Sequence, residues 1–99
     1  MKRPETIRVS GVIYQLSFPE KIDNGELNGE CDHDKCLIQV SLEQHPEMVK
    51  STLLHESIHA AAHGIDWKIR EGTVVKIEKM MFGLLRDNPE LVAWILEKE

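Results

Sequence analysis

The hydrophobic pattern of this chain changes near residue 45, and that change limits the folds open to it. Before this point, apolar and β-branched residues alternate with polar ones, as in strands that bury one face. After it, apolar residues recur three or four positions apart, as in helices that pack along one side. Strands followed by helices predict an α+β fold, with a small sheet packed on a helix pair and a short C-terminal helix.

Two hairpins are expected in the first half of the chain. The first covers residues 6–18, with its turn at Ser10-Gly11. The second pairs residues 27–31 with residues 36–42 across a short polar segment. Together they predict an antiparallel sheet of three or four strands.

The first helix has clear boundaries in the sequence. Pro46 suits the first helical position, and Glu47 places acidic charge in the first turn. Gly64 can adopt the left-handed conformation that often ends a helix. These signals predict a helix of about eighteen residues that ends at Gly64.

Two further helices are expected. One covers about residues 71–86, where apolar residues recur three or four apart. The other is short, follows Asn88-Pro89, and reaches about Leu96. Within it, Trp94 and its apolar neighbours are expected to lie in the core, as periodic apolar residues usually do.

Composition excludes several classes of protein. Ninety-nine residues, 41% of them hydrophobic, predict one domain over residues 1–99 with a single core. Twelve basic against seventeen acidic residues give a net charge of -5, which disfavours a nucleic-acid partner. Neither a membrane-spanning run nor a signal-peptide pattern is found, so a cytoplasmic protein without membrane contact is expected. Two cysteines are too few for a disulfide framework.

The first helix carries the pattern His-Glu-x-x-His at residues 55–59. Histidines four apart share one helical face, so His55 and His59 can bind one zinc ion at about 2.0–2.1 Å. Glu56 points about 100° further round the helix and can reach the water on the metal. Zinc lowers the pKa of that water toward about 7, and Glu56 can accept its proton and pass it to a leaving amine. The pattern predicts peptide-bond hydrolysis.

A zinc ion that keeps one position open for water needs a third protein ligand. The longer metzincin pattern is disfavoured, because Ala62 and Ile65 occupy its positions. His63 lies too far along the helix, so it should support the site from outside or face solvent. Glu71 and Glu78 remain, on one face of the second helix but about 10 Å apart, so only one of them can reach the metal.

A resemblance to a known group of proteins is carried by residues 52–60, 71–77 and 84–91, the last with Asp-Asn-Pro-Glu-Leu, and by the upstream residues 29–32 and 37–40. These segments resemble small phage and prophage zinc metallopeptidase-like proteins, which are similar to the ImmA/IrrE group. The resemblance covers about residues 27–95. In such proteins, a Glu that opens the helix after the motif is the third ligand, and the resemblance therefore implies Glu71.

Spacing alone favours the other glutamate. Thermolysin-like gluzincins place their third ligand nineteen or twenty residues beyond the second His, and Glu78 lies nineteen beyond His59. Glu78 is therefore the alternative third ligand. If Glu71 is the ligand instead, Glu78 should be a carboxylate that lies beside the site or in solvent.

Three functions are compatible with these residues. The first is a zinc metallopeptidase of narrow specificity that acts on a regulatory protein of a phage or prophage, as the resemblance implies. The second is a zinc-binding adaptor without turnover, similar to an antirepressor, and the third is a structural protein without metal. Glu56→Gln should abolish the function of the enzyme and leave the adaptor unchanged.

Two other features have alternative interpretations. Cys31, His33 and Cys36 offer only three ligands in six residues, so a hairpin turn is favoured over a second metal site. The strand at residues 36–42 is expected to border the zinc helix, where its backbone could pair with an extended substrate.

Overall fold

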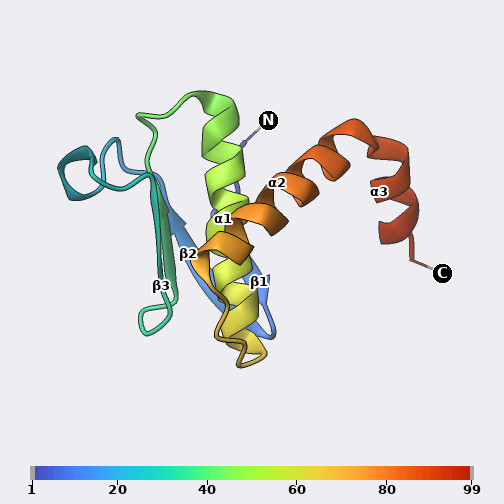
Figure 1. Cartoon of the computed structure of the whole chain (residues 1–99), viewed down its shortest axis with the longest axis horizontal. Coiled ribbons are helices and arrows are strands. Elements are labelled where there is room, and N and C mark those ends of the chain that lie inside the picture. Colours follow the sequence, from blue (N-terminus) through green and yellow to red (C-terminus); the bar gives the residue numbers. More distant parts are fainter. Residues whose placement is uncertain (1, 99) are drawn as a thin grey trace.

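The computed structural model describes residues 2–98 and confirms the α+β class. In Figure 1, α1 packs against the sheet, α2 begins beside α1 and then leads away from it, and α3 turns back at the far end. The elements in chain order are β1 (Thr6–Val9), β2 (Val12–Ser17), the 3-10 turn η1 (Asp23–Gly25), β3 (Gly29–Asp32), β4 (Leu37–Val40), α1 (Pro46–Gly64), α2 (Glu71–Asp87) and α3 (Pro89–Leu96).

The first hairpin forms as predicted. Val9 pairs with Val12 across a two-residue turn, in which Ser10 and Gly11 have φ values of 51° and 80°. Positive φ at both central residues is the geometry that matches the twist of two antiparallel strands.

Gly64 has a different role from the one predicted. It ends α1, but the left-handed residue after the helix is Asp66, with φ 57°. A Cβ at Gly64 would lie 2.5 Å from the Ser10 Oγ. A glycine is therefore required here because the end of α1 closely approaches the first hairpin turn.

The strand order is β1-β2-β4-β3, and one pairing differs from the prediction. The β1–β2 and β3–β4 pairs are antiparallel, but β2 and β4 run parallel. Residues 18–28 lead the chain from β2 to β3, which lies at the edge of the sheet. The second hairpin therefore pairs with β2 through its second strand, β4, and β4 runs in the same direction as β2. The prediction of an entirely antiparallel sheet was wrong for this central pair.

The main core lies between the sheet and α1. The alternation predicted for residues 36–42 is confirmed within β4, because Ile38 and Val40 are completely buried, but Leu42 lies beyond the strand and is exposed, so its predicted place on the core face was wrong. Tyr14 from β2 and Ala60 from α1 complete the cluster, and the small Ala60 side chain lets helix and sheet approach closely. Val74 of α2 is also fully buried.

The last two helices have the predicted bounds but not the predicted packing. Arg86 in α2 forms a two-point ion pair with Glu47 in α1. Among residues 2–98, α3 contacts no other element than α2. Trp94 is 72% exposed, so the prediction that it lies in the core was wrong. No helix within residues 2–98 combines the length and hydropathy needed to cross a membrane.

Candidate metal centre

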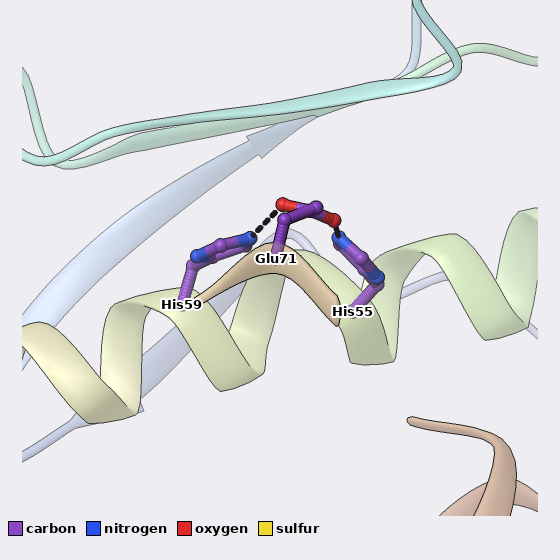
Figure 2. A group of neighbouring side chains, drawn as sticks. All are labelled: His55, His59 and Glu71. Atoms are coloured by element: carbon purple, nitrogen blue, oxygen red, sulfur yellow. Dashed lines mark hydrogen bonds and ion pairs between the residues drawn. The ribbon is translucent and has the colours of Figure 1, made fainter. Parts of the chain in front are cut away.

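The structure brings His55, His59 and Glu71 together, with one ligand atom from each lying within 4.8 Å of the others. Figure 2 shows the two imidazoles on one face of α1, with the Glu71 carboxylate between them. The His55 Nε2 lies 2.5 Å from one Glu71 oxygen, and the His59 Nε2 lies 3.0 Å from the other. Two imidazoles and one carboxylate are a ligand set that suits a zinc ion.

The link between α1 and α2 positions the carboxylate. Asp66 adopts its left-handed conformation just after α1, and the Trp67 N–H donates to the Ala62 carbonyl at 2.9 Å. The chain thereby reverses, so that α2 begins beside the histidine face of α1. Glu71 is the first residue of α2 and therefore lies above the two imidazoles.

Glu78 lies behind the site rather than in it. One of its oxygens lies 2.9 Å from the His55 Nδ1, and the other accepts a hydrogen bond from the Ser51 hydroxyl. A carboxylate on the far nitrogen of a histidine fixes the ring's orientation and tautomer, and leaves the near nitrogen free for a metal. Glu71 and Glu78, two turns apart, thus contact opposite nitrogens of the His55 ring.

The charge around His55 favours its protonated form. Burial lowers the pKa of this imidazole, but the hydrogen bond that it donates to Glu78 and the negative charges of Glu71 and Glu56 outweigh that effect and raise the pKa above 6.5. The surrounding carboxylates thus create an environment that attracts a cation, whether a proton or a metal ion.

Glu56 lies between α1 and β3 and is only 8% exposed. A Cβ at Gly29 would lie 2.9 Å from a Glu56 oxygen and 2.5 Å from the Thr52 Cγ2. Burial raises the pKa of Glu56, and the nearby histidines oppose that shift in part. A carboxyl group with a raised pKa can both accept and return a proton near neutral pH.

A cavity of about 320 Å³ adjoins the site. The predicted turn at His33 is confirmed, and the ring of His33 stacks on that of His63 with a centroid distance of 4.0 Å. His63 is exposed and lies outside the ligand group, as predicted. The cavity is lined by His33, His59, His63, Asp66, Trp67, Lys68 and Ile69.

The predicted alternative at Cys31, His33 and Cys36 does not form a ligand group. Among residues 2–98, the only three-residue group with converging ligand atoms is the one at His55, His59 and Glu71. Both cysteines are free thiols.

Sequence reasoning missed Gly29, which makes room for the Glu56 side chain, and the pairing of Tyr14 with His33. Both are contacts between distant segments and leave no local pattern. The position of Glu78 on the Glu71 face did carry a signal, but spacing cannot show which nitrogen of His55 it meets.

No protein-family model matches the chain, and comparisons with curated proteins and with solved structures give no match.

Proposed function

We propose that this protein is a zinc-dependent metallopeptidase, in which His55, His59 and Glu71 hold the metal and Glu56 is the general base. The observation that carries the proposal is the convergence of three zinc-type ligands beside a buried carboxyl group of raised pKa. The resemblance to phage and prophage proteins of the ImmA/IrrE type supports the same assignment from the sequence.

Each residue has a separate task in this reaction. Zinc, when bound, would polarise the attacking water and the carbonyl of the peptide bond. Glu56 accepts a proton from the water and returns it to the leaving amine. Glu78 holds the proton of His55 on Nδ1, so that Nε2 keeps its lone pair for the metal.

The structure favours β3 over β4 as the strand that binds the substrate. Gln39 in β4 pairs with strands on both sides, so the predicted role of β4 was wrong. The Ser41 N–H donates to the Asn28 carbonyl, and bonded pairs alternate in an antiparallel ladder. Gly29 and Cys31 therefore direct their backbone groups away from β4, beside Glu56.

An extended peptide added along β3 would pass the zinc site. A regulatory protein of a phage or prophage, presenting an exposed segment, fits this strand-adding geometry. Hydrogen exchange provides the test, because the Cys31 amide should become protected when a peptide binds the Glu56→Gln variant.

Metal content by mass spectrometry tests the ligand set. Wild type purified without added metal should contain one zinc per chain, and Glu71→Ala should lose it. Glu78→Ala should keep the ion with an affinity roughly 10–100-fold weaker. A wild-type protein without zinc would refute the proposal. If Glu78→Ala loses its zinc completely and Glu71→Ala keeps it, then Glu78 is the third ligand and Glu71 is not.

Turnover is tested separately with Glu56→Gln and a mixed fluorogenic peptide library. We expect this variant to keep its zinc and to cleave about 10²–10⁴-fold more slowly. The exposed α3 supports one second candidate, a zinc-bearing adaptor that binds a partner without cleaving it. In that case, wild type and Glu56→Gln would bind the partner equally well, and neither would cleave the library.

A further inference from the structure

His33 is held in place by three neighbours that the proposed chemistry does not yet use. Its ring lies on the turn between β3 and β4 and stacks on His63, with an angle of 4° between the two planes. Its Nδ1 lies 3.2 Å from the Tyr14 hydroxyl and 3.6 Å from the Cys31 sulfur. Such a fixed ring can present its remaining nitrogen, Nε2, in a defined direction.

The two neighbours of Nδ1 determine which nitrogen carries the proton. Tyr14 is 3% exposed, and its hydroxyl has no other hydrogen-bond partner in the chain from residue 2 to 98. A hydroxyl that only accepted here would leave its own hydrogen unpaired in the core, which is costly. Tyr14 therefore donates to the His33 Nδ1.

Cys31 also favours the tautomer in which the His33 Nδ1 carries no hydrogen. Burial, with the nearby charge of Glu56, raises the pKa of this thiol to about 12, so Cys31 keeps its S–H at neutral pH. The S–H can donate only to Nδ1, which then serves as an acceptor. In a neutral imidazole the other nitrogen carries the hydrogen, so Nε2 is a donor.

The ring is also neutral near pH 7. Burial, together with the neighbouring His63 and His59, lowers the pKa of His33 below 6.5, and the opposing charges of Asp32 and Asp34 are weaker influences. A neutral donor can stabilise negative charge without competing for the metal or for the Glu56 carboxylate.

The location connects this donor to the reaction. His33 and His59 line the same cavity of about 320 Å³, so a group in that cavity lies beside a proposed zinc ligand and within reach of the turn. Negative charge develops on the carbonyl oxygen when a peptide bond is attacked, and a preorganised donor aimed at that oxygen speeds the reaction.

The geometry points to His33 as a further catalytic residue, whose Nε2–H donates a hydrogen bond to the oxygen of the scissile carbonyl. Tyr14 and Cys31 are positioning residues that hold His33 in this tautomer. This role rests on the proposed peptidase function, which requires zinc at His55, His59 and Glu71.

In the reaction, the water oxygen bonds to the carbonyl carbon while Glu56 takes a water proton. The carbonyl π electrons move to the oxygen, where His33 donates its hydrogen bond without transferring the proton. The carbon–nitrogen bond then breaks as those electrons return, and the amine nitrogen takes the proton from Glu56. The products are a carboxyl group and an amine.

Histidine-selective ¹⁵N NMR of the metal-free protein tests the tautomer directly and does not depend on peptidase activity. We expect His33 to carry its hydrogen on Nε2 in wild type, and Tyr14→Phe to increase the Nδ1–H form. A wild-type ring with its hydrogen on Nδ1, or charged at pH 7, would overturn the inference even if zinc binds as proposed.

Binding of a phosphinic peptide to the zinc-loaded protein tests the catalytic role, because its tetrahedral oxygens resemble the attacked carbonyl. His33→Ala should weaken this binding by roughly 10–100-fold, since the lost hydrogen bond is to a charged oxygen. Acetohydroxamate, which needs only the metal, should bind wild type and variant equally. His33→Gln, which retains a donor, should recover part of the loss.

His45→Ala serves as the matched control, because His45 only caps the start of α1. Equal weakening of both probes in His33→Ala, or none for the phosphinic peptide, would refute the role of His33. Failure of wild type to bind zinc would instead refute the proposed function and, with it, this role.

Discussion

At the residue scale, the candidate centre depends on how two carboxylates share one imidazole. Glu71 meets the Nε2 of His55 and Glu78 meets its Nδ1. The ring is therefore fixed between two α2 residues that are two helical turns apart. In the proposed centre, this arrangement would link the protonation of His55 to the affinity for a metal, because a proton and a zinc ion would compete for the same Nε2.

Zinc affinity should consequently depend on pH. The pKa of His55 is raised, so the proton is retained to higher pH and zinc must displace it. We expect the affinity of wild type to rise between about pH 5 and 8 and then to level off. In Glu78→Gln, the hydrogen bond that raises this pKa is weakened, so the rise should move to lower pH. Competition with a zinc-binding dye measures both profiles, and identical profiles would contradict the assigned role of Glu78.

Gly29 should tolerate no side chain. A Cβ would meet the Thr52 methyl and the Glu56 carboxylate, so we expect Gly29→Ala to lower the free energy of unfolding by about 1–3 kcal/mol. Gly83→Ala is a suitable control, because nothing lies within 4 Å of its added Cβ and a helical alanine should stabilise by about 0.5–1 kcal/mol. Urea unfolding measures both. Equal effects of the two substitutions would disprove the close approach of β3 to α1.

At the scale of elements, local signals were sufficient for most of the fold. The turn pair at Ser10-Gly11 located the first hairpin, and Pro46 and Pro89 marked two helix starts. The direction of β4 relative to β2 had no local signal, since it depends on how residues 18–28 cross the sheet. The motif at residues 55–59 similarly indicated two candidate ligands, but the third candidate depended on the turn between α1 and α2.

Strand β4 provides the central layer of the core, and its burial can be measured. Ile38 is fully buried beneath α1, so Ile38→Ala should cost about 2–5 kcal/mol of unfolding free energy. Ile13 in the neighbouring β2 is 49% exposed, and the same substitution there should cost much less. Thermal and urea unfolding of both variants would test this, and a cost at Ile13 as large as that at Ile38 would mean that the buried face of the sheet is misassigned.

At the scale of the whole molecule, the helices are not packed equally well. The radius of gyration is 13.8 Å, slightly above the value of about 13 Å expected for 100 residues, because α2 and α3 extend beyond the sheet and α1. Most apolar residues of α3 and of the C-terminal part of α2 are exposed, and an apolar cavity of about 710 Å³ lies between β1, α1 and α2. Apolar exposure on this scale is typical of contact surfaces.

Trp94 offers a direct test of this exposure. Because its side chain is 72% exposed, Trp94→Ala should change the free energy of unfolding by no more than about 0.5 kcal/mol. Acrylamide should also quench most of the fluorescence that this substitution removes. A loss above about 2 kcal/mol in dilute solution would show that α3 is covered, either by the rest of the chain or by a second copy.

The short separation of the proposed ligands affects the order in which the molecule can assemble. Only twelve positions separate His59 from Glu71, and closing so small a loop costs little chain entropy. The cover over Glu56 comes instead from Gly29 in β3, and this contact closes a longer loop, the 27 positions from residue 29 to residue 56. During refolding, the helix pair can therefore close early, and the chain can capture an ion before Glu56, the proposed general base, is buried.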